Sequence, residues 1–301
     1  MKIILSSDEK YLPHAAALIK SIYANTAAEV EINFLYLDLM PESIEKLRRF
    51  VVECNGCIKF IPVDISPIAG FPARGHISLS AYLRMLAPLY VESDQAVYLD
   101  VDTIVLADIS TIMAGIRDDY YVYAVEEPNS EKYRLGFPPG KPYFNSGCMV
   151  MNLRLWRRDN LTDKLLARSA QFGWEQTYHD QDTMNYVLDG NFGLLHPRWN
   201  VHHAVADRRY WPKFSCYTQE QLEEAISKPG IVHFSFGKPW NYGCEHRFRH
   251  YYRQYRSQTP WEYSSPAGFT WEKFFIFYKN QISQMIPESI KRIIRNKKRD
   301  E

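Results

Sequence analysis

The chain has 301 residues, a hydrophobic fraction of 46% and a formal net charge of +1. This length suits one large α/β core or two smaller ones, and the balanced charge argues against nucleic acid as a partner. Five scattered cysteines do not form the pattern of a disulfide framework. The sequence shows neither a signal peptide nor a run of 18 apolar residues, so we expect a cytoplasmic protein without a membrane-spanning helix.

The first part of the chain alternates between strand and helix patterns. Strands are predicted at 2–5, 32–37 and 58–61, with helices at 13–25 and from Pro41 between them. Such alternation favours parallel strands in a sheet that helices cover on both faces. Ligands of these sheets bind beyond the carboxyl ends of the strands. The polar loop 6–11, which follows the first strand, is therefore a candidate site.

The later elements are a helix over 79–90, a long apolar strand over 96–106, and helical patches at about 152–172 and 180–189. The composition changes after residue 245. Residues 291–301 carry six Lys or Arg against two acids, a local charge of +4. Basic helices with aromatic residues bind anionic membrane surfaces. We expect a folded domain at 1–245 and a tail at 246–301 that places the protein on the inner face of the cytoplasmic membrane; the alternative is a solvated C-terminal helix.

Two acids, Asp100 and Asp102, lie near the centre of the strand predicted over 96–106. Residues i and i+2 of a strand face the same side, and neighbouring carboxylates repel each other unless a cation lies between them. Hard oxygen ligands suit Mg²⁺ or Mn²⁺, which also bind phosphate. The pattern predicts a divalent metal site, with the alternative that Asp102 turns outward or caps the next element.

A third metal ligand is expected from His233, which follows a short apolar run and is predicted at the end of a strand. Lys238 follows closely, and its ammonium group suits a phosphate. A lone histidine is more often structural than a ligand. The occurrence of His, Gly, Lys and Trp within residues 233–240 favours the functional interpretation.

These segments resemble glycosyltransferase family 8, and within it the bacterial lipooligosaccharide and lipopolysaccharide α-galactosyltransferases. The resemblance runs from residue 1 to about 240 and rests on segments that occur in family order: 6–11, 76–84, 97–102, 143–147, 179–182 and 233–240. It implies a GT-A type, Rossmann-like fold that binds a nucleotide-sugar, with a largely parallel central sheet and a helical basic C-terminal tail.

The resemblance also implies a role for each matching residue. Residues expected at the donor are Asp8 and Tyr11 at the uracil, together with Ser6, Arg84, Val101, Asn145, Gly237 and Lys238. Asp100, Asp102 and His233 would bind Mn²⁺ or Mg²⁺, and Lys238 would stabilise the departing UDP. Asn145, Asp180 and Gln181 would line the sugar pocket, where Glu127 loosely matches another acid that contacts the donor sugar.

The implied reaction is transfer of galactose or glucose from a UDP-sugar to a glycan hydroxyl, with retention, in lipopolysaccharide or another cell-surface glycan, including lipid-linked ones. Retention normally requires a nucleophile, yet Gln181 is an amide. Either Gln181 stabilises a cationic sugar during same-face attack, or Asp180 or Asp182 takes part; Asp180 is also expected to cap a helix. The histidines His202 and His203 are structural or line the acceptor cleft.

Two other functions stay open at this point. A metal-dependent phosphatase or nucleotidyltransferase also uses paired aspartates, and a non-catalytic UDP-sugar-binding protein can share the same fold.

Overall fold

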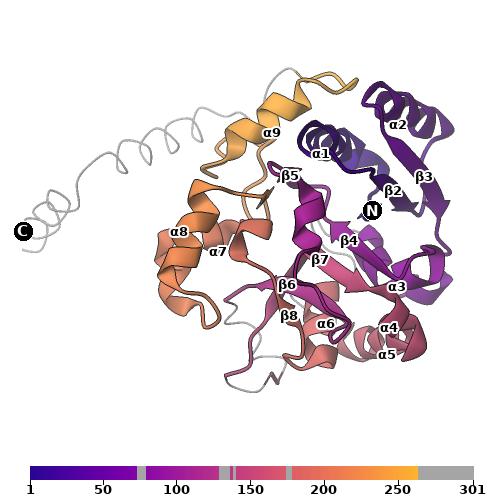
Figure 1. The fold of residues 1–301 in the computed structure, drawn as a ribbon. Coiled ribbons are helices and arrows are strands. Elements are labelled where there is room, and N and C mark those ends of the chain that lie inside the picture. Colours follow the sequence, from indigo (N-terminus) through magenta and orange to yellow (C-terminus); the bar gives the residue numbers. More distant parts are fainter. Residues whose placement is uncertain (73–78, 129–135, 138–139, 174–177, 264–301) are drawn as a thin grey trace, which may run out of the picture.

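The computed structural model describes residues 1–72, 79–128, 136–137, 140–173 and 178–263. A central sheet has its strands in the order β3-β2-β1-β4-β7-β6-β8 (Figure 1). Its strands are β1 (Lys2–Ser6), β2 (Glu31–Tyr36), β3 (Cys57–Pro62), β4 (Gln95–Leu99), β6 (Val122–Glu126), β7 (Phe144–Asn152) and β8 (Gly193–Leu194). A second, two-stranded sheet pairs β5 (Thr103–Val105) with β9 (Ile231–His233).

Most of the central sheet is parallel, as predicted. The strands β3, β2, β1 and β4 pair in parallel, and so do β6 and β8. The exception is β7, which runs antiparallel between β4 and β6. An antiparallel strand starts at the edge where its parallel neighbours end. The first residues of β7 therefore lie at the same edge as the carboxyl ends of β1 and β4.

Helices cover both faces of the sheet (Figure 1). They are α1 (Leu12–Asn25), α2 (Pro41–Glu53), α3 (Leu83–Tyr90), α4 (Leu153–Arg158), α5 (Leu161–Phe172), α6 (Asp180–Leu188), α7 (His203–Ala206), α8 (Gln219–Ser227) and α9 (Arg249–Arg256). Alternate residues of β1 enter different cores. Ile3 and Leu5 pack in the core with α1 and α2, while Ile4 packs in the core with α3 and α5.

The prediction of one continuous strand over 96–106 is wrong. The run divides into β4 and β5, which belong to different sheets, and Asp100, Val101 and Asp102 form the turn between them. The Thr103 amide closes this turn with a 3.1 Å hydrogen bond to the carbonyl of Asp100. Both flanking strands are buried on both sides, so the apolar run continues across the turn and conceals it.

The helical patch predicted over 152–172 is likewise two helices, α4 and α5. They are separated at Asn160, whose φ of +48° lies in the left-handed region that asparagine tolerates.

The helix α9 packs on α1, as Figure 1 shows. The Tyr252 hydroxyl lies 2.6 Å from His14 Nδ1, and Asn25 Nδ2 donates to the Tyr255 hydroxyl at 2.7 Å. Phe248, Tyr252 and Tyr255 belong to the same core as α1. Residues 246–263 of the expected tail thus fold onto the rest of the protein, while 264–301 lie outside the described residues. The division of the chain at residue 245 stays a prediction.

Within the described part of the chain, no helix combines the length and the apolar character needed to cross a bilayer.

Candidate active site

Several segments that are distant in sequence meet at the carboxyl edge of β1 and β4. They are the end of β1 at Ser6, the turn 100–102 after β4, the start of β7 at 145–147, the end of β9 at His233 and the start of α6. Topology alone places binding sites at this edge of an open α/β sheet.

The three expected metal ligands converge in the structure. Asp100, Asp102 and His233 each offer a ligand atom, and these atoms lie within 4.8 Å of one another. His233 Nε2 is 3.3 Å from Asp102 Oδ1 and 3.7 Å from Asp100 Oδ2. An octahedral divalent cation with ligands at about 2.1 Å holds adjacent ligand atoms about 3 Å apart. The triad therefore needs little movement to hold such a cation.

The tautomer of His233 also suits a metal ligand. Its Nδ1 lies 3.1 Å from both Asn145 Oδ1 and Asn200 Oδ1. The orientation of Asn145 is fixed because its Nδ2 donates to Glu127 at 2.7 Å and its Oδ1 accepts from the Gly147 amide at 3.0 Å. Two amide oxygens at Nδ1 require the proton there. The lone pair of Nε2 then faces two carboxylates, an arrangement that is repulsive without a cation and favourable with one.

Asn200 was not predicted as a site residue. It lies in the segment between β8 and β9, where nothing in the local sequence indicates a role. Only the fold brings it 3.1 Å from His233.

Gly147 provides the space in which the metal triad forms. A Cβ at this position would lie 2.2 Å from His233 Cε1 and 2.7 Å from Asp100 Oδ2. The backbone of β7 approaches the triad closely, since the Asp100 amide donates to the Gly147 carbonyl at 2.8 Å. Any side chain at position 147 would displace His233 or Asp100.

A buried guanidinium orients Asp100. Arg84 Nη2 donates to Asp100 Oδ1 at 2.7 Å, and Arg84 Nε lies 3.0 Å from Asp180 Oδ2. Arg84 Nη1 donates at 2.9 Å to the carbonyl and the hydroxyl of Ser146. Burial would lower the pKa of Arg84, but the two carboxylates raise it above the usual value. Asp100 Oδ1 is thus held, and Oδ2 is turned toward His233.

Asp180 does not cap α6, contrary to the prediction. It is the first residue of the helix, the N-cap position belongs to His179, and the Asp180 carboxylate turns to Arg84 instead. Burial raises the pKa of Asp180 to about 7, although Arg84 acts in the opposite direction.

Lys238 and Asp102 form a buried ion pair. Lys238 Nζ donates to Asp102 and also, at 3.0 Å, to the carbonyl of Phe234. Burial would raise the pKa of Asp102, but Lys238 and His233 more than offset it and hold that pKa well below its usual range. The alternative that Asp102 turns outward is therefore wrong. The ammonium group of Lys238 thus lies beside a carboxylate that is expected to bind the metal.

The expected uracil loop lies next to this pair. Asp8 Oδ1 accepts from the Tyr11 amide at 3.2 Å and so opens a short 3-10 turn over Glu9–Tyr11. Tyr11 lies edge-on to Trp240, with ring centroids 5.7 Å apart, and Trp240 stacks on His14 at 3.6 Å. Trp240 is part of the motif at 233–240, whereas the contribution of His14 was not predicted.

Ser6 is connected to the metal triad through Tyr98. The Ser6 hydroxyl lies 2.9 Å from the Tyr98 hydroxyl, which donates to Asp100 Oδ1 at 3.1 Å. The other two residues expected at the donor adjoin site residues in the sequence. Val101 separates the two acids of the turn, and Gly237 directly precedes Lys238.

The residues expected at the donor sugar form one buried network. Gln181 Oε1 accepts from the Ser146 amide at 2.9 Å, and Gln181 Nε2 donates to Glu127 Oε2 at 3.1 Å. Asn145 donates to the same carboxylate oxygen. Burial would raise the pKa of Glu127, but His202 and His203, with the two amides, hold it below its usual value. Glu127 is thus a buried carboxylate at the centre of the network.

Asp182 is engaged in holding the fold. Its Oδ1 accepts from the Tyr143 hydroxyl at 2.7 Å, and its Oδ2 accepts from the Tyr178 amide at 2.8 Å.

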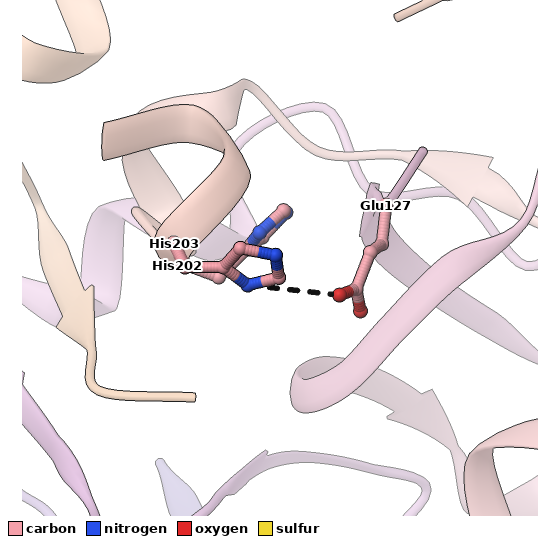
Figure 2. A group of neighbouring side chains, drawn as sticks. All are labelled: Glu127, His202 and His203. Atoms are coloured by element: carbon pink, nitrogen blue, oxygen red, sulfur yellow. Dashed lines mark ion pairs between the residues drawn. The ribbon is translucent and has the colours of Figure 1, made fainter. Parts of the chain in front are cut away.

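A second group of possible metal ligands, Glu127, His202 and His203, lies beside this network (Figure 2). His202 Nδ1 accepts from the Ala204 amide at 3.3 Å, so its proton is on Nε2, which donates to the Glu126 carbonyl at 3.0 Å. Burial lowers the pKa of His202 to about 4. Both nitrogens of His202 serve the fold, and only Glu127 and His203 remain, which is too few for a metal site.

The family model for glycosyl transferase family 8 matches residues 2–244. The chain belongs to glycosyltransferase family 8. It is therefore a glycosyltransferase with a nucleotide-sugar donor and a glycan acceptor, and a divalent metal, a UDP-sugar and a retaining reaction all fit this family. The expected fold class is confirmed, and the two rival functions lose their support.

The chain is also similar in sequence to individual known proteins. General stress protein A of Bacillus subtilis is 29% identical over 87% of this chain and 94% of its own length. The lipopolysaccharide 1,2-glucosyltransferase of Escherichia coli is 24% identical over 82% of this chain and 77% of its own length. Other relatives are longer, and the chain spans 63%, 61% and 32% of three of them.

A solved structure shares the fold. The crystal structure of the galactosyltransferase LgtC with donor and acceptor sugar analogues has a TM-score of 0.76 and 22% identity. The likeness covers 88% of this chain and 98% of LgtC.

Proposed function

We propose that this family 8 enzyme is a retaining hexosyltransferase that moves galactose or glucose from a UDP-sugar to a hydroxyl of a cell-surface glycan. The observation that supports this most is the orientation of His233, whose Nε2 lone pair faces Asp100 and Asp102. The three residues suit Mn²⁺ or Mg²⁺, which bind phosphate oxygens readily. The relationship to a lipopolysaccharide glucosyltransferase supports the acceptor class.

In this proposal the residues around the triad bind and orient the donor. Asp8 and Tyr11 contact the uracil, and Ser6, Arg84, Val101 and Gly237 complete the nucleotide site. Breaking the sugar–phosphate bond leaves negative charge on the diphosphate, and a bound divalent cation offsets part of it. Lys238 Nζ lies beside Asp102, where it can donate to the same oxygens as that charge develops. A preorganised contact of this kind contributes about 2–4 kcal/mol to lowering the barrier.

Gln181 is the group we propose beneath the anomeric carbon, with Asn145 and Asp180 around the sugar. Its side chain is held at both ends, by Ser146 and by Glu127, and is therefore preorganised. The two carboxylates considered as its helpers already have partners, Arg84 for Asp180, and Tyr143 with Tyr178 for Asp182. This favours same-face attack, in which Gln181 stabilises positive charge on the sugar.

A panel of UDP-sugars tests the donor. We expect metal-dependent release of UDP from UDP-galactose or UDP-glucose, abolished by EDTA and restored by Mn²⁺. Release that is insensitive to EDTA, or release only from donors that are not hexoses, would contradict the proposal. Gln181→Ala should lower the rate on the order of 100-fold or more while the protein stays folded.

We further propose that the acceptor is lipid-linked and that residues 264–301 bring the enzyme to an anionic membrane surface on the inner face of the cytoplasmic membrane. Six basic residues lie within 291–301. Flotation with liposomes rich in phosphatidylglycerol should recover the full chain but not a chain that ends at Tyr263. The cut is placed after α9 because that helix is part of the core. Equal recovery of both proteins would refute the membrane role.

A further inference from the structure

An aromatic cluster joins three segments of the chain beside the expected uracil loop. Its members are Tyr11, His14 of α1, Trp240 in the segment after β9, and Tyr252 of α9. The rings of His14 and Trp240 are stacked, with centroids 3.6 Å apart and planes inclined by 15°. Tyr11 lies edge-on to both rings, with its centroid 5.5 Å from that of His14 and 5.7 Å from that of Trp240. His14 therefore connects α1 to the segment that carries the Lys-Pro-Trp motif.

The ring of His14 is held in one orientation. Its Nδ1 lies 2.6 Å from the hydroxyl of Tyr252, and the Tyr252 side chain is buried. Burial lowers the pKa of His14 to about 3, and the positive charge of Arg256 lowers it further, so the ring is neutral at pH 7. A neutral imidazole stacks on an indole ring without the cost of burying a charge. His14 thus presents a fixed, flat face to Trp240.

The stack on His14 also restrains Lys238, through a short turn. Trp240 follows Lys238 by two residues, with Pro239 between them. The Asn241 amide donates to the carbonyl of Lys238 at 3.0 Å and closes the turn. Proline fixes its own backbone angle φ, so a closed turn that contains it has few conformations. A fixed position of Trp240 therefore fixes the backbone of Lys238 as well.

Tyr11 lies near the ion pair that Lys238 makes with Asp102. Burial raises the pKa of Tyr11, and the nearby charges affect it too: Lys238 lowers this pKa, whereas Asp102 and Asp8 raise it. The phenol of Tyr11 is therefore within electrostatic reach of the pair. Because Tyr11 is proposed at the uracil and Lys238 at the diphosphate, the stack of His14 on Trp240 adjoins the residues for both ends of UDP.

We propose that His14 is a positioning residue for the binding of a nucleoside diphosphate. Stacked on Trp240, it holds Tyr11 at the place of the uracil and the turn 238–241 at the place of the diphosphate. This inference rests on the proposed function. Each side chain that must be ordered when a ligand binds weakens affinity by about two- to tenfold. Loss of the stack frees two such side chains, those of Tyr11 and Lys238.

The test is His14→Ala, measured by isothermal titration of UDP in Mn²⁺ and again in EDTA. We expect UDP to bind about tenfold more weakly than to the wild type in both buffers, because two contact residues are no longer held in place. The ratio of the two affinities should stay at its wild-type value, since His14 does not contact the metal triad. A general collapse of the site would lower this ratio as well.

A double-mutant cycle with Trp240→Ala shows whether His14 acts through the stack. If both residues act through one contact, the double variant should bind UDP about tenfold more weakly than the wild type, as each single variant does, and not about 100-fold more weakly. His14→Phe keeps a flat ring but lacks Nδ1. Its affinity for UDP should stay within about threefold of the wild-type value.

The matched control is Asn25→Ala. Asn25 lies about three turns along α1 from His14 and also contacts α9, because its Nδ2 donates to the Tyr255 hydroxyl at 2.7 Å. Its loss loosens the packing of the same two helices without touching Trp240. Asn25→Ala should therefore keep the wild-type affinity for UDP, even where urea unfolding shows that it is as destabilised as His14→Ala.

The outcomes separate this inference from the function on which it rests. Affinity of His14→Ala for UDP within about threefold of the wild-type value would overturn the role of His14. Additive effects in the double variant, or an equal loss of affinity in Asn25→Ala, would overturn it as well. A wild-type protein that binds UDP in neither buffer and hydrolyses neither UDP-galactose nor UDP-glucose would instead refute the proposed function itself, and with it this inference.

Discussion

At the scale of single residues, the site depends on which nitrogen of His233 carries its proton. Asn145 and Asn200 fix the proton on Nδ1, and the lone pair of Nε2 is thereby directed at two carboxylates. The sequence predicted the three ligands and Asn145, because each lies in a recognisable motif. It could not predict Asn200, since that contact depends on how the segment before β9 returns to the sheet.

Gly147 gives the sharpest test at this scale. In Gly147→Ala, the new methyl group would lie 2.2 Å from His233 Cε1, so the ring or the strand must shift. We expect the Mn²⁺-dependent affinity for UDP to fall at least about tenfold and the free energy of unfolding to fall by about 1–3 kcal/mol. Titration calorimetry and urea unfolding measure the two effects.

Gly70→Ala is the matched control for this change. Its Cβ would meet nothing within 4 Å, so affinity and stability should both stay at the wild-type level. If Gly147→Ala bound UDP as tightly as this control, the close packing of β7 against the triad would not matter for binding.

At the scale of elements, the helices and strands predicted from the sequence have the correct type but imprecise limits. The alternation of strands and helices up to β3 was predicted because each element carries its own periodicity. The turn at 100–102 was missed because β4 and β5 are almost entirely buried and read as one apolar run. Strand β7 was not predicted at all, and so neither was its antiparallel direction. Asp100 and Asp102 nevertheless lie together, as expected, because a tight turn also brings them close.

The helix α9 makes a prediction at this scale. Phe248, Tyr252 and Tyr255 are buried against the core that contains α1. Replacing one such aromatic residue by alanine costs about 3–5 kcal/mol, and small proteins have only about 5–15 kcal/mol in total. A chain that ends at residue 245 should therefore lack a cooperative unfolding transition, whereas a chain that ends at Tyr263 should unfold at the same temperature as the full protein.

Circular dichroism during heating distinguishes the two truncated chains. A cooperative transition at the wild-type temperature in the chain of residues 1–245 would show that α9 is a separate tail, as the sequence alone suggested.

At the scale of the whole molecule, buried histidines should make the protein sensitive to acid. Burial lowers the pKa of His14 and His246 to about 3 and that of His202 to about 4. Unfolded histidine titrates near pH 6.5, so the unfolded state binds more protons below that value, and stability is lost as the pH falls from 6.5 toward 4. Asp180 increases stability over the same pH range. Its pKa of about 7 lets the folded protein bind a proton that the unfolded protein does not bind until lower pH.

The stability lost through the three histidines exceeds the stability gained through Asp180. The free energy of unfolding should therefore be lower at pH 5 than at pH 7, by on the order of 3 kcal/mol. Urea unfolding at the two pH values, in EDTA, measures this difference. Equal or greater stability at pH 5 would mean that these histidines are not kept neutral by the fold.

We propose above all that Asp100, Asp102 and His233 bind a divalent cation that holds the diphosphate of the donor. Isothermal titration of UDP into the wild-type protein, once with Mn²⁺ and once with EDTA, tests it most directly. We expect UDP to bind at least about tenfold more tightly with Mn²⁺, and this difference to be lost in Asp102→Asn. Equal affinity for UDP with and without the metal would contradict it.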